Sequence, residues 1–302
     1  MSDEPNLLGS YLRARREQVT PESVGLPRAG VRRVAGLRRE EVAMLAGISA
    51  DYYLRLEQGR DRNPSVQVLE SVARVLRLDD AGTAYLLGLA ADRPRRRRRR
   101  GRRETVPAGT RKLLDVIGLP AFVEGRYFDV LAVNTLATAL SPRLRVGGNR
   151  LRDVFLDPAE RALYAGHADL EAVAAQVVAG FRESVGTETD DPRLIELVGE
   201  LSLASEAFRA LWARHDVRVR EGAVTVLDHP EVGDLRLNRE KLAVGGAPGL
   251  TLVVYHADAG TPDEEKLRLL ASYAATGPGA SAGGKDPAGG AGMVSRAREL
   301  GG

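Results

Sequence analysis

The feature that most limits how this chain can fold is a run of positive charge about one third of the way along it. Nine of the eleven residues at 93–103 are arginine, and like charges at that density cannot pack into a core. With 302 residues, the chain is long enough for a separate core on each side of the run. The predicted organisation is a domain at 6–91, a solvated linker at 92–108, a second domain at 109–275 and a disordered Gly- and Ala-rich tail at 276–302.

Composition narrows the class of protein. Hydrophobic residues make up 43% of the chain, which is typical of a globular protein. No apolar run approaches the ~20 residues of a membrane span, and the first residues lack a basic stretch followed by an apolar one. The chain has no cysteine, which excludes disulfides and thiolate metal sites. We therefore predict a cytoplasmic protein that makes no contact with membranes.

Residues 37–59 indicate a helix, a turn and a second helix. The first helix is predicted at 38–46, and Gly47 can adopt the positive φ that a sharp turn needs. Ser49 is a good N-cap for the second helix, predicted at 50–58, because its hydroxyl can accept a hydrogen bond from the first turn. Two helices joined in this way either form a DNA-binding unit or an ordinary solvated corner of a helical domain.

The second helix has two different sides. At about 100° per residue, Tyr53 and Leu56 point the same way and are predicted to be buried. Arg55 and Gln58 lie on the opposite side and are suited to guanine and adenine edges, respectively. The predicted DNA contacts share that exposed side or flank it: Arg38, Arg39, Ser49, Ala50, Asp51, Tyr52, Leu54, Arg55, Gln58 and Arg60.

These residues have different predicted roles. Arg38 and Arg39 open the first helix, where the guanidinium groups and the helix N-terminus all favour a phosphate. Asp51 either accepts a hydrogen bond from a cytosine amino group or holds Arg55 across one helical turn. Glu57 lies toward the buried side, so it is better explained as a structural ion-pair partner than as a DNA contact.

Three further helices complete the first domain. One is predicted at 6–19. The next is predicted to begin with Asn63 as N-cap and Pro64 at the first helical position. The last is predicted at 80–90, with Asp79 as its N-cap. Together with the pair at 37–59, they predict an all-α domain of five helices.

The string GLRREEVAMLAGISADYYLRLEQGRDRNPS at 36–65 resembles the Xre/Cro-type helix-turn-helix domain. More narrowly it is similar to the MmyB-like regulators, whose signature includes the paired tyrosines and the RLEQGR run. The resemblance covers residues 7–90. It implies a lambda-repressor-like fold that binds double-stranded DNA as a homodimer, on two half-sites about one helical turn apart.

The second half of the chain changes to short apolar runs. Runs at 119–124 and 128–133 flank a Gly-containing turn, and Asn134 can cap a following helix. This order resembles the entry of a PAS-type domain. Helical stretches follow as far as residue 214, with a closing helix at 262–273. Further candidate strands lie at 217–219, 223–228, 233–237 and 250–256.

The strings at 212–217 and 229–235 are also similar to the carboxy-terminal domain of MmyB-like regulators, which implies an α+β, PAS-like, ligand-binding domain. A curved sheet packed against helices can leave a cavity for a small, mostly apolar ligand, and an acyl-type or polyketide-like molecule suits the resemblance. The candidate lining residues are large and apolar, and each is also explained as ordinary core: Phe122, Val130, Val133, Leu140, Phe155, Leu211, Trp212 and Tyr255.

No arrangement of residues indicates catalysis. The four histidines, at positions 167, 215, 229 and 256, lack HxxxH or HExxH spacing. A GxSxG string at 279–283 lacks the strand and helix that a nucleophile elbow needs. We therefore predict a transcription regulator without enzymatic activity, metal or cofactor. The alternative is a scaffold that binds nucleic acid through the arginine run at 95–100 and a partner protein through its second domain.

Overall fold

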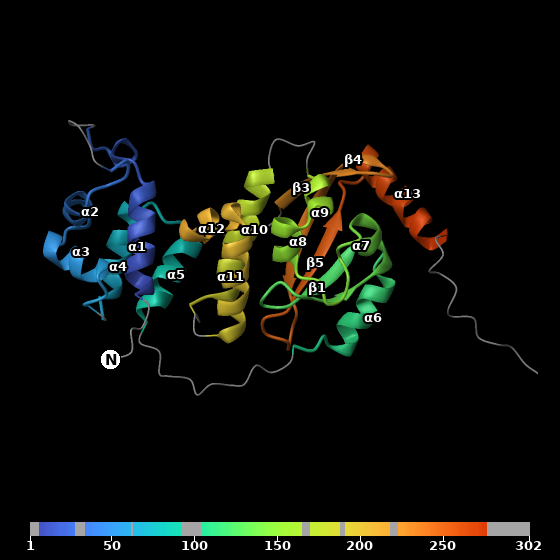
Figure 1. Ribbon diagram of the computed structural model, residues 1–302, viewed down its shortest axis with the longest axis horizontal. Coiled ribbons are helices and arrows are strands. Elements are labelled where there is room, and N and C mark those ends of the chain that lie inside the picture. The colour runs from blue at the N-terminus through green and yellow to red at the C-terminus, as the bar shows by residue number, and fades with distance from the viewer. Residues whose placement is uncertain are drawn as a thin grey trace, which may run out of the picture.

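In the computed structural model, a helical unit is joined to a larger unit of helices and one sheet (Figure 1). The structure describes residues 6–27, 34–61, 63–91, 104–164, 170–187, 191–217 and 223–276. The arginine run at 93–103 and the predicted tail from 277 onward lie outside the described residues. For residues 92–103 and for the tail, the prediction of a solvated linker and a disordered tail therefore stays a prediction. Val106, which also belongs to the predicted linker, is instead buried in a core of the second unit.

Five α-helices make up the described part of the first unit, together with a 3-10 turn at Pro21–Val24. Their apolar sides form one core, in which Tyr11 and Leu12 of the first helix are almost completely buried. The all-α prediction for this unit is confirmed. The helices are α1 (Leu7–Gln18), α2 (Arg39–Ala46), α3 (Ala50–Glu57), α4 (Val66–Val75) and α5 (Asp80–Ala90).

The predicted start of α4 is wrong. Ser65, not Asn63, is its N-cap, and the Ser65 hydroxyl accepts a hydrogen bond from the N–H of Val68 at 3.3 Å. Asn63 instead donates its own N–H to the Asp61 carboxylate. Pro64 is buried just before the helix. Because Ser65 has extended backbone and a short hydroxyl side chain, it meets the requirements of an N-cap two residues later than predicted.

The second unit contains a five-stranded antiparallel sheet with the strand order β2-β1-β5-β4-β3. Alternate side chains point to opposite faces. Phe122 and Val253 therefore face one side, against α7 and α13, while Val123 and Val254 face the other, against α6. The α+β prediction is confirmed. The strands are β1 (Ala121–Glu124), β2 (Val130–Val133), β3 (Ala223–His229), β4 (Gly233–Ala243) and β5 (Thr251–His256).

Strand β4 runs six residues beyond its predicted end at 237. Its second half, which includes Arg239, Glu240 and Lys241, is polar, so the sequence pattern gives no strand signal there. Pairing with β5, from Asn238 to Ala243, makes it a strand. Of the strand predicted at 217–219, residue 217 lies in no strand, and the other two residues lie outside the described part of the chain.

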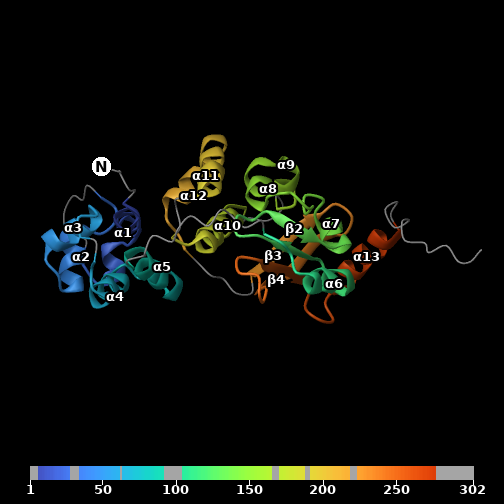
Figure 2. The same ribbon diagram turned by 90° about the horizontal axis from the view of Figure 1, so that it is seen from below.

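The helices of the second unit form two groups. Helices α10, α11 and α12, with α8, lie between the first unit and the sheet, whereas α7 and α13 pack together beside β1 and β4 (Figures 1 and 2). Asn134 caps α7 as predicted, but no helix was predicted at α6. The helices are α6 (Ala108–Val116), α7 (Thr135–Leu140), α8 (Arg150–Leu156), α9 (Pro158–Ala162), α10 (Leu170–Val185), α11 (Pro192–Ala204), α12 (Glu206–Ala213) and α13 (Pro262–Thr276).

Candidate functional site

Helix α3 turns one side to the core and the other to solvent. Tyr53 and Leu56 are fully buried, as predicted. The Ser49 hydroxyl accepts a hydrogen bond from the N–H of Tyr52 at 3.1 Å, and Gly47 has a φ of 71°. Both views place α3 at the end of the molecule opposite α13 (Figures 1 and 2). The residues predicted to contact DNA are all exposed or half-buried: Arg38, Arg39, Ser49, Ala50, Asp51, Tyr52, Leu54, Arg55, Gln58 and Arg60.

The Arg55 side chain is oriented by an aromatic ring. Its guanidinium carbon lies 5.5 Å from the centroid of the Tyr52 ring. Burial, and then the charge and hydrogen bond of Asp61, raise the pKa of the Tyr52 phenol above its ordinary value. Within the described part of the chain, no ion pair joins Asp51 to Arg55. Of the two roles predicted for Asp51, the contact with Arg55 is therefore not formed in this structure.

Glu57 is a buried charge shared by two arginines. Its Oε1 lies 2.6 Å from Nε of Arg16, and its Oε2 lies 2.7 Å from Nε of Arg39. This confirms the structural ion-pair role predicted for Glu57. The Arg39 side chain is still 43% exposed, and a guanidinium has five N–H donors. The ion pair therefore fixes one edge of Arg39 and leaves other donors facing solvent at the start of α2.

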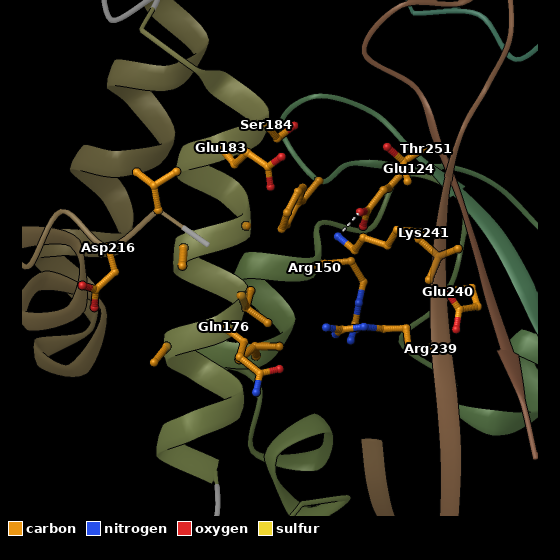
Figure 3. Close-up of a pocket in the computed structure, with 18 of the residues that line it drawn as sticks. Glu124, Arg150, Gln176, Glu183, Ser184, Asp216, Arg239, Glu240, Lys241 and Thr251 are labelled. Atoms are coloured by element: carbon orange, nitrogen blue, oxygen red, sulfur yellow. Dashed lines mark hydrogen bonds and ion pairs between the residues drawn. The ribbon is translucent and has the colours of Figure 1, made fainter. Parts of the chain in front are cut away.

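A cleft of about 830 Å³ lies between α10 and the sheet and extends to the first unit (Figure 3). Its apolar lining includes Phe128 and Val154 as well as two residues predicted from the sequence, Phe122 and Tyr255. The rings of Phe122 and Tyr255 stack with their centroids 6.5 Å apart. The cleft therefore offers an apolar surface to a ligand, as expected of a small-molecule site.

The other six residues predicted to line a ligand cavity do not line this cleft. Three of them pack in the core formed by the sheet with α7 and α13: Val130, Val133 and Leu140. Three pack in the core of the helical group that contains α10 to α12: Phe155, Leu211 and Trp212. Both locations match the alternative explanation of these residues as ordinary core.

Basic side chains from α8 and β4, none of them among the predicted lining residues, also line the cleft. Figure 3 shows Arg150, Arg239 and Lys241 pointing into it. Arg150 is neutralised by Glu160 at 2.8 Å, and Lys241 by Glu124 at 2.7 Å. Among the residues that the structure describes, none forms an ion pair or hydrogen bond with the half-buried Arg239 side chain. Arg239 is therefore available to an acidic ligand.

The opposite wall of the cleft is less charged. Glu183 of α10 points into the cleft (Figure 3), and burial raises the pKa of its carboxyl above the ordinary value, opposed by the charge of Lys241. The described residues include no group of histidine and carboxylate side chains that could hold a metal ion. None of the described helices is long and apolar enough to cross a membrane. The site thus has the character of a binding cleft whose lining includes the unpaired cation of Arg239.

Comparison with protein families finds two matches. Residues 7–86 match a helix-turn-helix domain, and residues 106–270 match the ligand-binding domain of MmyB-like transcription regulators. Comparison with curated proteins finds no match. Both families are regulatory rather than enzymatic. The second match spans more than half of the chain, and the chain therefore belongs to the MmyB-like family of transcription regulators, with a helix-turn-helix domain followed by a ligand-binding domain.

Proposed function

We propose that the protein is a cytoplasmic, homodimeric regulator that reads DNA sequence with α3 and senses a small, mostly apolar ligand in the cleft beside α10. The observation that supports this most directly is the exposed side of α3. Arg55 and Gln58 are exposed there and suit base edges. Arg38 and Arg39 start the adjacent α2, and Glu57 holds Arg39 in place for a phosphate.

Replacing Arg55 by alanine is expected to weaken binding to the operator about 10- to 100-fold, because a bidentate contact to guanine discriminates by about 1–3 kcal/mol. Binding to scrambled DNA should change little. The measurement is fluorescence anisotropy with DNA from upstream of the protein's own gene, at about 0.15 M salt. The unaltered protein should prefer this DNA about 10³-fold over scrambled DNA. Arg74→Ala is the matched control, because Arg74 is exposed on α4, outside the predicted DNA surface.

Equal affinity for both DNAs, with a steep dependence on salt, would contradict sequence reading through α3 unless the operator lies elsewhere. It would favour the scaffold function, in which the arginine run provides the affinity. Each phosphate neutralised on duplex DNA steepens the log–log salt slope by ~0.9. Deleting residues 95–100 distinguishes these explanations, because only a contribution from the run makes the slope shallower.

The ligand that suits the cleft is mostly apolar and carries one acidic group. Phe122, Phe128 and Tyr255 supply the apolar contacts, and the unpaired guanidinium of Arg239 supplies a partner for the acid. An acyl-type molecule with a carboxylate has both properties. The antiparallel sheet with helices packed against it supports a PAS-like assignment for this domain.

Replacing Arg239 by glutamine is expected to weaken the binding of anilinonaphthalene sulfonate, an apolar anion, about 10-fold. The reason is that a hydrogen bond to a charged group contributes about 1.5–3 kcal/mol, less where the site is open to water. The measurement is a fluorescence titration. Arg236→Gln is the matched control, since Arg236 lies on the same strand but is exposed outside the cleft. Equal losses in both variants would contradict the role of Arg239.

A further inference from the structure

A short segment of the ligand-binding domain is built into the DNA-binding domain. Residues 214–217, called the strap from here on, follow the end of α12. Val217 is 6% exposed and packs in the apolar core of the helix-turn-helix domain. The helix-turn-helix core is thus completed by a residue more than 120 positions beyond its last helix, and the strap cannot leave without exposing apolar surface.

Polar contacts hold the strap against α1. Nη1 of Arg15 lies 2.5 Å from Oδ1 of Asp216, and Nε2 of Gln18 donates to the Arg214 carbonyl at 2.7 Å. Nε of Arg214 lies 2.9 Å from the other carboxylate oxygen of Asp216. The Asp216 side chain is 21% exposed, so these contacts define the position of the strap more than they add stability.

The strap is also joined to α10. Nη1 of Arg182 lies 3.3 Å from Nδ1 of His215, and because Arg182 can only donate, Nδ1 is the acceptor. Burial, and then the charges of Arg182 and Arg15, lower the pKa of His215 to about 4, so the ring is neutral and able to accept. Arg182 also lies 3.8 Å from the centroid of the Trp212 ring and donates to the Trp212 carbonyl.

The same residues form one end of the ligand cleft. Arg214, Asp216 and Val217 of the strap line it, and so do Arg15 and Gln18 of α1. Figure 3 shows Asp216 on one side of α10, and Arg239 and Lys241 of the sheet on the other. The cleft is therefore lined by both domains, although the ligand-binding family match begins only at residue 106.

We propose that the strap makes the ligand site a site shared by the two domains, so that filling the cleft repositions the helix-turn-helix domain and changes its affinity for DNA. The inference rests on the proposed function, because it requires that the cleft be the ligand site. A ligand can shift the equilibrium between two arrangements of the domains only if it binds one arrangement more tightly than the other. The strap provides that difference, since a displacement of Asp216 or Val217 within the cleft also breaks contacts with α1 or with the helix-turn-helix core.

The test uses the full chain and a side chain in place of the unidentified ligand. The sequence has no cysteine, so Gln67→Cys and Glu265→Cys, both exposed, give one spin label on each domain. Ala175→Trp fills the cleft, and Ala172→Trp, on the same helix but outside the lining, is its control. We expect Ala175→Trp to change the distance between the labels and Ala172→Trp to leave it unchanged. Its DNA affinity should change within the ~5- to 150-fold range of allosteric coupling.

The strap is then altered in the same labelled protein. Asp216→Asn with Val217→Ala should abolish the shift that Ala175→Trp produces. Asp263→Asn is the control and should leave the shift in place. The Asp263 side chain is 23% exposed, which is close to the 21% of Asp216. Circular dichroism confirms that each variant is folded, and Ala175→Leu replaces Ala175→Trp if the larger side chain prevents folding. The inference is overturned if the filled cleft leaves the label distance unchanged, or if the shift persists in the altered strap.

The two possible failures are separable. Loss of the preference for operator over scrambled DNA refutes the proposed function, whereas a strap-dependent shift in label distance would still support the shared site. Conversely, normal sequence preference and normal probe binding, combined with an unchanged label distance, would refute only the coupling through the strap.

Discussion

Replacing Glu57 by alanine is expected to lower the free energy of unfolding of the helix-turn-helix domain by about 3–5 kcal/mol, the usual effect of breaking a buried ion pair from one side. The Glu57 side chain has no exposed surface, and that of Arg16 is only 6% exposed. Without the carboxylate, the Arg16 guanidinium stays buried and retains its hydrogen bond to the Leu37 carbonyl, at 2.8 Å, but loses its buried counter-charge. An exposed ion pair would give a far smaller effect.

Glu17→Ala is the matched control for this prediction. Glu17 also pairs with Arg16, at 3.7 Å, but its side chain is 55% exposed, so its loss should cost about 0–1 kcal/mol. Denaturant unfolding followed by circular dichroism reports on the helices of both domains. The fluorescence of the only tryptophan, Trp212, reports on the ligand-binding domain. Equal effects of the two substitutions would show that Glu57 is not the buried centre of this network.

The local features of the fold could be predicted from the sequence. Ser49, Asp79 and Asn134 cap their helices as predicted, because an N-cap depends on residues within three positions of it. The buried side of α3 could be predicted for the same reason, since the helical period fixes which residues share a side. The first residue of α4 could not be predicted in this way, because Asn63 and Ser65 are both good N-caps. Only the path of the backbone in the folded domain selects between them.

The ligand cleft could be predicted only in part, because its lining comes from segments far apart in the sequence. Arg15 and Asp216 are separated by 201 positions, and no spacing rule connects them. Apolar character also fails to distinguish cleft from core, so Phe122 lines the cleft while Phe155 packs among helices. Two of the basic residues of the cleft, Arg239 and Lys241, lie on the polar half of β4, which becomes a strand only through its pairing with β5. Arg239 was therefore not a candidate.

Replacing Phe208 by alanine is expected to lower the free energy of unfolding of the ligand-binding domain by about 3–5 kcal/mol without weakening the binding of an apolar anion to the protein that remains folded. Phe208 is completely buried. Its ring meets the edge of Phe155 at 5.2 Å and stacks on Trp212 at 5.9 Å between centroids. Phe155 and Trp212 were both candidates for the ligand site, and Phe208 is the residue that joins them into one aromatic cluster.

The stability of Phe208→Ala therefore distinguishes core from ligand site in this cluster. Trp212 fluorescence reports directly on its unfolding, because the indole is in contact with Phe208. Leu203→Ala is the control: Leu203 is on α11 and 89% exposed, so its loss should change stability by no more than about 0.5 kcal/mol. A Phe208→Ala protein of normal stability that no longer bound anilinonaphthalene sulfonate would place the ligand in the aromatic cluster. The expected result, lower stability with unchanged probe affinity, agrees with the proposed ligand site between α10 and the sheet.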